Sequence, residues 1–208
     1  MPLPREDFKV FISHATTEDG KLAAWIEEAL DRLHIRAFVY ERYPRGGQNR
    51  FEVIKATITK CPYFLALLTR DGIASQWVNQ EIGYAVGVGK AVIPVVEVDG
   101  VTGRRIESKG FVELHDPIDY HRNDPIGLMH LIIYTFYSYL IEKGQWQDVI
   151  FLSCQCGNEF EGKLEYEKWL TKWVRNPKPF SIRWTCDKCQ QQVTISFPDC
   201  HLIPQNQI

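Results

Sequence analysis

The regular alternation of short apolar runs with helical patterns is the feature that most constrains how this chain folds. Four apolar runs are predicted as buried strands, and a shorter fifth run follows them: residues 8–13, 36–40, 63–69, 91–98 and 110–114. Their residues are apolar throughout rather than at every second position, which is typical of strands covered on both faces. Strands that alternate with helices in this way form a parallel sheet with helices on both sides.

Helices are predicted between these strands because apolar residues recur there at spacings of three and four. The predicted helical segments are residues 22–33, 51–60, 75–88 and 128–141. Thr16 or Thr17 is a suitable N-cap for the first of them. Residues 41–50 are predicted as a loop, since Pro44, Gly46 and Gly47 interrupt regular structure.

The overall composition is that of a globular protein. The chain has 208 residues, of which 45% are hydrophobic and 24% charged, and its formal net charge is −2. This balance gives no general attraction to nucleic acids or anionic membranes. The N-terminal residues lack the apolar segment of a secretory signal. The longest apolar stretch, residues 128–141, is shorter than the roughly 18 to 20 residues that a membrane span needs. We therefore expect a soluble, cytoplasmic protein.

The character of the sequence changes after Gly144, and we predict two domains, residues 1–144 and 145–208. The second domain contains two closely spaced cysteine pairs, Cys154-x-Cys156 and Cys186-x-x-Cys189. Short spacings of this kind place two thiolates on one side of a metal ion. The pairs therefore predict a zinc-ribbon-like domain with one four-cysteine zinc site, which is structural because four cysteines leave no open coordination position.

Two alternatives to this zinc site follow from the same cysteines. Free thiols or a disulfide are disfavoured in a cytosolic chain, and Cys200 with His201 is a weaker alternative ligand pair. Zinc ribbons often bind nucleic acid, but seven basic and seven acidic residues balance one another from Asp148 onward. Trp169, Trp173 and Trp184 suit stacking on bases, or packing in a core. We favour a role in sensing, protein binding or assembly over nucleic-acid binding.

Four stretches in the first domain occur in a characteristic order. They are VFISHA at residues 10–15, YERYPRGGQ at 40–48, FLALLT at 64–69, and SQWVNQEIGYA at 75–85, which leads to AVIPVVEVDG at 91–100. Taken together over residues 8–141, they resemble a TIR domain, most closely the bacterial and archaeal ones. The Trp-x-x-x-Glu pattern alone occurs in many helices, so the resemblance depends on the order and spacing of all four. It implies a flavodoxin-like, doubly wound parallel sheet with strand order 2-1-3-4-5.

The resemblance also implies an activity. Many TIR domains cleave the nicotinamide–ribose bond of NAD, and they release ADP-ribose or a cyclic ADP-ribose isomer. The family's catalytic residue is the Glu of Trp-x-x-x-Glu, which is Glu81 in this sequence. Animal receptor and adaptor TIR domains are scaffolds that usually lack this Glu. Its presence favours an NAD-consuming enzyme, in the setting of prokaryotic immune signalling.

The helical projection of residues 75–88 places Glu81 and Trp77 beside each other at the border of the apolar stripe. The stripe itself consists of Val78, Ile82, Ala85 and Val86. A carboxyl group in such a partly desolvated position has a raised pKa. One carboxylate is enough for the chemistry, because nicotinamide leaves as a neutral group and only the oxocarbenium-like ribose needs stabilisation. The alternatives are a solvated Glu81 and a packed aromatic Trp77.

Further substrate contacts come from the resemblance. In TIR enzymes the residues just after the first strand contact the ligand, and here these are Ser13, His14 and Ala15. For His14, an exposed loop imidazole is the alternative. The stretch from Tyr40 to Gln48 matches the loop that caps the TIR site and mediates TIR–TIR assembly, which assigns substrate contacts to Tyr40 and Arg45.

Arginines in and beside this loop are candidates for the NAD phosphates, because a guanidinium pairs with phosphate through two hydrogen bonds. They are Arg42, Arg45 and Arg50, and solvated loop charge is the alternative for each. The expected partners are NAD and other TIR domains or further copies of this chain. Two other functions stay open: a non-catalytic TIR scaffold, and a nucleoside deoxyribosyltransferase of related fold that uses its Glu as a nucleophile.

Overall fold

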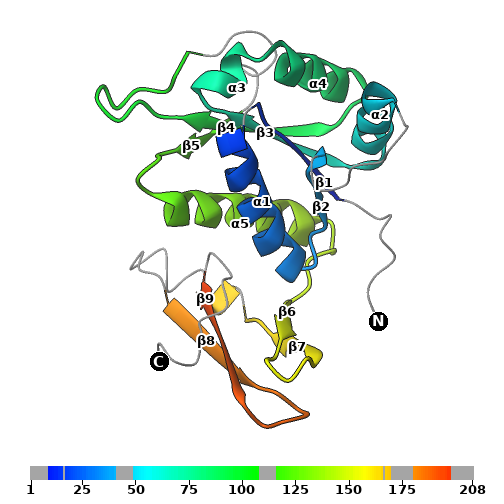
Figure 1. The fold of residues 1–208 in the computed structure, drawn as a ribbon, viewed down its shortest axis with the longest axis vertical. Helices are drawn as coiled ribbons and strands as arrows, with labels where there is room; N and C mark the ends of the chain where they lie inside the picture. The colour runs from blue at the N-terminus through cyan, green and yellow to red at the C-terminus, as the bar shows by residue number, and fades with distance from the viewer. Residues whose placement is uncertain are drawn as a thin grey trace. The chain divides into compact units, whose positions relative to one another are not determined.

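The computed structural model describes residues 9–15, 17–40, 49–107, 116–165, 167–169 and 180–197 (Figure 1). The chain divides into two compact units. The first contains residues 1–27 and 35–128, and the second contains residues 28–34 and 129–208. The second unit therefore includes the end of the first helix as well as the cysteine-bearing segment, and the predicted domain boundary at residue 144 remains a prediction.

The first unit contains one parallel sheet of five strands in the order β2-β1-β3-β4-β5. The strands are β1 (Val10–Ser13), β2 (Ala37–Phe38), β3 (Tyr63–Leu68), β4 (Ala91–Glu97) and β5 (Ile118–Tyr120). This order confirms the predicted flavodoxin-like fold. It reverses direction between β1 and β3, which lie side by side with Ser13 in register with Ala66.

The first four strands confirm the sequence prediction, although β2 is only two residues long. The predicted fifth strand at residues 110–114 lies outside the described residues. The strand observed in the fifth position, β5, was missed because it carries no apolar run. Only Ile118 is buried, while Asp119 and Tyr120 are half-buried at the edge of the sheet.

Among the described residues the four predicted helices are present, together with the short α3 (Arg70–Ala74), which was not predicted. The helices are α1 (Thr17–Arg32), α2 (Arg50–Lys60), α3 (Arg70–Ala74), α4 (Gln76–Gly87) and α5 (Pro125–Glu142). The short α3 forms because the Thr69 side chain accepts a 3.0 Å hydrogen bond from the Gly72 N–H. Ser75 then caps α4 by accepting a hydrogen bond from the N–H of Val78.

A single apolar cluster joins α2 and α4 to one side of the sheet, as Figure 1 shows for the helices. In it the ring of Phe11 on β1 stacks between Phe38 and Phe64, with centroid distances of 5.6 and 5.4 Å. The predicted stripe of α4 is confirmed, since Val78, Ile82 and Ala85 are buried in this cluster and Val86 packs against it. Burying a Val or Ile side chain in this way contributes about 1.5–3 kcal/mol. The same packing fixes which side of α4 faces the sheet.

The second unit contains two antiparallel hairpins, β6 (Val149–Ser153) with β7 (Glu159–Lys163), and β8 (Phe180–Thr185) with β9 (Gln192–Phe197). They are joined through Trp184, whose indole N–H donates a 3.1 Å hydrogen bond to the carbonyl of Lys163. The ring also lies over Gly162, where a Cβ would come within 2.6 Å of the indole nitrogen. Trp184 and Trp169 pack in this unit, the latter stacked on Phe180 at 4.8 Å.

The end of α1 is attached to the first hairpin within the second unit. His34 adopts a left-handed φ of 60° and directs its ring towards Phe151, with centroids 5.4 Å apart. Its Nε2 lies 3.6 Å from a carboxylate oxygen of Glu161. Tyr137 of α5 makes an edge contact with Trp146 at 4.9 Å. Among the described residues, no helix is long and apolar enough to cross a membrane.

Candidate functional site

The carboxyl end of β1 and the middle of α4 meet at one hydrogen bond. The hydroxyl of Ser13 donates to Oε2 of Glu81 over 2.5 Å. This contact lies where the strand order reverses, which is where open parallel sheets bind their ligands. The structure therefore brings together Ser13 and Glu81, two of the residues that the resemblance assigns to the site.

Glu81 is more buried than its position on the helical projection predicted. Its exposed fraction is 7%, and that of Ser13 is 1%. The prediction of a border position was wrong because a projection considers only the helix itself. Here the covering groups come from elsewhere, since Ser13 is 68 residues away in the sequence.

The environment of Glu81 raises its pKa to about 7. Burial is the dominant cause, because desolvation disfavours the charged carboxylate. Hydrogen bonds from Ser13 and from the side chain of Trp77 act in the opposite direction, as do the charges of Arg50 and His14. Near neutral pH the side chain therefore exchanges readily between its acid and its carboxylate form.

His14 and Ala15 are both half-buried beside this contact. The imidazole of His14 lies over Gly20 of α1, where a Cβ would come within 3.2 Å of its Cε1. His14 is thus a packed residue rather than an exposed loop imidazole. Ala15 packs against the apolar cluster of α2 and α4.

The rings of Tyr40 and Trp77 both lie close to Arg50, the first residue of α2. The guanidinium carbon lies 4.7 Å from the centroid of the Tyr40 ring and 5.0 Å from that of Trp77. Phe51 adds an edge contact to Trp77 at 6.3 Å. Arg50 was predicted as a candidate for phosphate binding, and its guanidinium lies over the rings of Tyr40 and Trp77. Arg42 and Arg45, like Gly46 and Gly47, lie outside the described residues.

A partly open pocket lies between α2 and α4 next to these rings. Its lining residues come only from these two helices: Phe51, Ile54, Lys55, Ile58, Trp77, Gln80, Glu81 and Tyr84. Phe51, Lys55 and Gln80 were not predicted. The four-residue spacing of Phe51 and Lys55 on one helical face was the available signal.

A second buried carboxylate, Glu97 at the end of β4, was also not predicted. Arg122 donates two hydrogen bonds to it, at 2.5 and 3.1 Å, and the N–H of Arg70 donates a third at 3.2 Å. The hydrogen bonds from Arg122 are the main reason that the pKa of Glu97 is lowered. The pKa values of Glu81 and Glu97 are thus shifted in opposite directions, and of this pair Glu81 exchanges protons near neutral pH.

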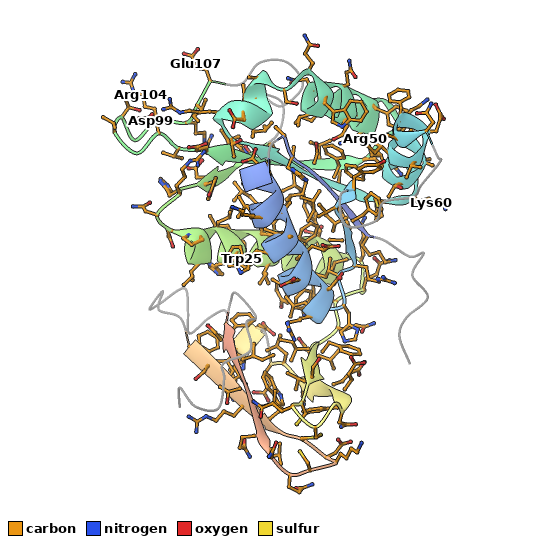
Figure 2. All side chains as sticks on the ribbon, in the orientation of Figure 1. Trp25, Arg50, Lys60, Asp99, Arg104 and Glu107 are labelled. Carbon is orange, nitrogen blue, oxygen red and sulfur yellow. The ribbon has the colours of Figure 1, made fainter. Side chains whose placement is uncertain are left out.

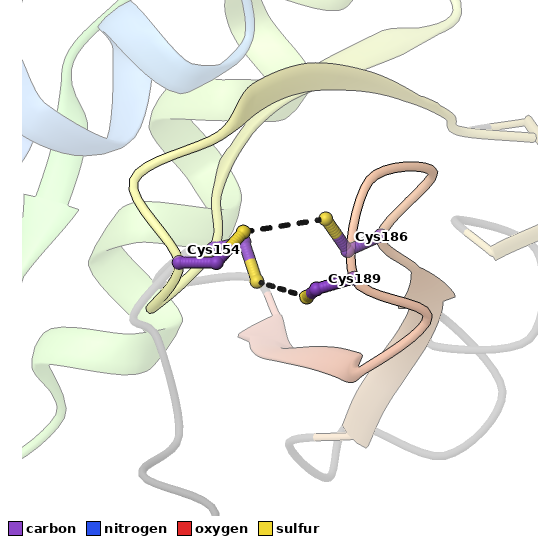
Figure 3. Close-up of side chains that lie close together, drawn as sticks. Cys154, Cys186 and Cys189 are labelled. Atoms are coloured by element: carbon purple, nitrogen blue, oxygen red, sulfur yellow. Dashed lines mark hydrogen bonds between the residues drawn. The ribbon is translucent and has the colours of Figure 1, made fainter.

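The four predicted cysteine ligands are brought together in the second unit, all their sulfur atoms lying within 4.8 Å of one another. Figure 3 shows Cys154, Cys186 and Cys189 around a common centre. The Cys154–Cys189 and Cys156–Cys186 sulfur distances are 3.5 and 3.8 Å. A tetrahedral zinc site with Zn–S bonds of about 2.3 Å requires sulfur atoms about 3.8 Å apart. The arrangement therefore fits a metal ion, and none of the four forms a disulfide.

Each cysteine pair occupies the turn of one hairpin, and the two turns share a backbone pattern. In each turn the residue that follows the second cysteine donates a backbone hydrogen bond to the carbonyl of the first cysteine. Gly157 donates to Cys154 over 2.9 Å, and Gln190 donates to Cys186 over 2.9 Å. Gly157 and Gln190 both have positive φ values, 78° and 61°. These tight turns direct two thiols to the same side, as expected for a metal-binding knuckle. Cys200 and His201 lie outside the described residues.

Comparison with known proteins assigns the chain to a family. The family model described as TIR domain matches residues 10–132. The chain belongs to the TIR domain family. Among solved structures, the TIR domain of the Toll-related receptor TRR-2 from Hydra magnipapillata is similar, with 18% identity, a TM-score of 0.49, and coverage of 65% of this chain and 97% of that one. No curated protein matches the chain.

Proposed function

We propose that this protein is an NAD-cleaving TIR enzyme of the bacterial and archaeal type, with Glu81 as its catalytic residue. The main observation behind the proposal is that the carboxyl group of Glu81 is buried and accepts a hydrogen bond from Ser13 at the point where the strand order reverses. The TIR family includes NAD-cleaving enzymes and non-catalytic adaptors. A scaffold has no need for a desolvated carboxyl group at this point, because burying one unpaired with a cation is costly.

The proposed reaction breaks the bond between the nicotinamide nitrogen and C1 of the adjoining ribose. The bonding electrons go to the nitrogen, so nicotinamide leaves as a neutral molecule and needs no proton. Positive charge then develops on the ribose. The carboxylate form of Glu81 stabilises this charge, and its effect is strengthened by its burial. Ser13 holds the carboxylate in place, and Trp77 lines the same pocket as Glu81.

The intermediate is then captured by a nucleophile, which determines the product. Attack by water releases ADP-ribose, whereas attack by the adenine base of the same molecule gives a cyclic ADP-ribose isomer. Half-buried aromatic walls such as Trp77 and Tyr40 limit the access of water. We propose that the product serves as a signal in prokaryotic immunity.

The second part of the proposal concerns the C-terminal segment, residues 145–208. We propose that it is a zinc-ribbon-like domain in which Cys154, Cys156, Cys186 and Cys189 hold one structural zinc ion. The zinc ion would supply cross-links between the two hairpins and take no part in the reaction. Such a module suits assembly with further copies of the chain or with other TIR domains.

The activity is tested by following nicotinamide release from NAD by chromatography. The variant is Glu81→Gln, which keeps the size of the side chain and removes its charge. Glu107→Gln is the matched control, since Glu107 is exposed and lies near Arg104 at the end of the first unit distant from Arg50 (Figure 2). We expect Glu81→Gln to lower turnover by about 100-fold or more, the usual cost of removing a group that stabilises transition-state charge. Equal turnover in wild type and Glu81→Gln excludes the catalytic assignment.

A further inference from the structure

The guanidinium of Arg50 lies over the rings of Tyr40 and Trp77, and these two rings define what we call the aromatic slot. The guanidinium carbon of Arg50 is within 5.0 Å of both ring centroids. A guanidinium group is flat, its charge is delocalised, and it stacks on aromatic faces. The slot therefore already holds a ligand of defined chemistry, namely a flat cation that the chain itself supplies.

The slot adjoins the carboxyl group of Glu81. Trp77 forms one wall and lines the same pocket as Glu81, and both Trp77 and the charge of Arg50 act to lower the pKa of this carboxyl group. A cation held in the slot therefore meets two stabilising features at once, aromatic faces and a nearby group that can ionise. Few neutral ligands gain from both.

We propose that the aromatic slot binds a flat aromatic cation, and that Arg50 fills it in the ligand-free chain as an internal competitor. The identity of the natural ligand rests on the proposed function: in NAD the pyridinium ring is a flat, delocalised cation. Binding then exchanges one cation for another, so the charge next to Glu81 is preserved while the guanidinium moves out.

The exchange needs little rearrangement. Arg50 is exposed at the start of α2, and its long side chain reaches solvent without movement of the helix. The slot also explains why the substrate should bind more tightly than the product. Cleavage turns the pyridinium cation into neutral nicotinamide, which loses its attraction to the aromatic faces and to the carboxylate. Arg50 then regains the slot, which favours release of the product.

Phosphate binding by Arg50 is the competing role, and two fragments of NAD separate the two roles. The cation 1-methylnicotinamide carries the pyridinium charge and no phosphate. ADP-ribose carries both phosphates and no pyridinium. Binding of each fragment to the full chain is measured by isothermal titration calorimetry at fixed ionic strength, for wild type and Arg50→Gln. Arg104→Gln is the matched control, because it removes the same charge from an exposed arginine far from Arg50 (Figure 2).

We expect Arg50→Gln to bind 1-methylnicotinamide about two- to fivefold more tightly than wild type, the factor that one exposed cation–π contact carries. Its affinity for ADP-ribose is expected to stay the same, and Arg104→Gln is expected to match wild type for both fragments. Unchanged or weaker binding of 1-methylnicotinamide by Arg50→Gln overturns the proposal. Weaker binding of ADP-ribose by Arg50→Gln would mean that Arg50 binds the phosphates, and it would also overturn the proposal.

A double variant separates the slot from a simple effect of charge. Adding Tyr40→Leu to Arg50→Gln removes one wall of the slot, so the gain in affinity should disappear. If the gain in affinity for 1-methylnicotinamide persists in the double variant, the loss of charge near Glu81 explains it. That result would contradict binding of the cation in the slot. These titrations do not require turnover. If NAD is not cleaved but Arg50→Gln binds 1-methylnicotinamide more tightly, the proposed function is wrong while the proposed cation-binding slot is supported.

Discussion

Ser13 and Glu81 are joined by a hydrogen bond of 2.5 Å between the end of β1 and the middle of α4. Ser13 is the donor and the carboxyl group of Glu81 is the acceptor, so the contact is strongest when Glu81 is ionised. It therefore opposes the effect of burial on the pKa of Glu81. The pKa of the proposed catalytic residue is therefore raised by burial and lowered in part by a partner on a different element.

Substituting Ser13 should move the pH dependence of the reaction. Ser13→Ala removes the bond that favours the carboxylate, so the pKa of Glu81 should rise further above 7. A hydrogen bond to a charged group is worth about 1.5–3 kcal/mol, which corresponds to a shift of about one unit or more. We expect the rising limb of the pH–rate profile of NAD cleavage to move up accordingly. Ser13→Thr keeps the hydroxyl and should preserve the profile; identical profiles for Ser13→Ala and wild type would contradict the role of the bond.

Glu81 should make the folded protein less stable as the pH rises. Its pKa is about 7 in the folded chain and about 4.5 when unperturbed. Between these values the folded state binds more protons than the unfolded state, so the free energy of unfolding falls as the pH rises through this window and the loss is complete above pH 7. Glu81→Gln carries no titrating group and avoids this loss.

The measurement is chemical denaturation of wild type and Glu81→Gln at pH 5 and pH 8. We expect the variant to gain stability relative to wild type at pH 8, by at most about 3 kcal/mol. The exposed control Glu107→Gln should show no such dependence. A difference between wild type and Glu81→Gln that is the same at both pH values would mean that Glu81 is not desolvated.

Much of the fold could be predicted because its signals are local. The run around Phe64 and the spacing of Val78, Ile82 and Ala85 each report burial through their neighbours in sequence. The edge strand β5 lacked such a signal, since Asp119 and Tyr120 are polar and half-buried. The site could be predicted only in part. The burial of Glu81 depends on Ser13, and the position of Arg50 depends on Tyr40 and Trp77, and all of these partners are distant in sequence.

Gly72 should not tolerate a side chain, because the chain passes too close to it. A Cβ at this position would lie 2.2 Å from the carbonyl oxygen of Leu67. We expect Gly72→Ala to lower the free energy of unfolding by about 1–3 kcal/mol, the usual cost of overpacking. Gly83→Ala in α4 is the control, since nothing lies within 4 Å of its Cβ position. It should be neutral or stabilising by up to about 1 kcal/mol. Denaturation of both variants checks this, and equal effects would contradict the close approach.

Loss of the proposed zinc ion should loosen the second unit and leave the sheet intact. Cys186→Ser removes one ligand, whereas Cys61→Ala removes a buried cysteine that lies outside the cluster. Elemental analysis should find one zinc per chain in wild type and in Cys61→Ala, and much less in Cys186→Ser. Equal zinc in Cys186→Ser and wild type would contradict the site.

Hydrogen exchange after treatment with a chelator shows how far this effect reaches. Protection should fall in the β6–β7 and β8–β9 hairpins, and also at the end of α1, because His34 contacts Phe151 and Glu161. Protection in β3 and β4 should be unchanged, since these strands belong to the first unit. An equal loss in both units would mean that the metal stabilises the chain as a whole.

The central claim is that Glu81 catalyses cleavage of NAD, and nicotinamide release over a series of protein concentrations tests it most directly. The series is needed because TIR enzymes often require self-association, which a dilute sample lacks. We predict that wild type and Glu107→Gln release nicotinamide at a rate per chain that increases with concentration, while Glu81→Gln remains about 100-fold slower or more throughout. Equal rates for wild type and Glu81→Gln at every concentration would contradict the claim.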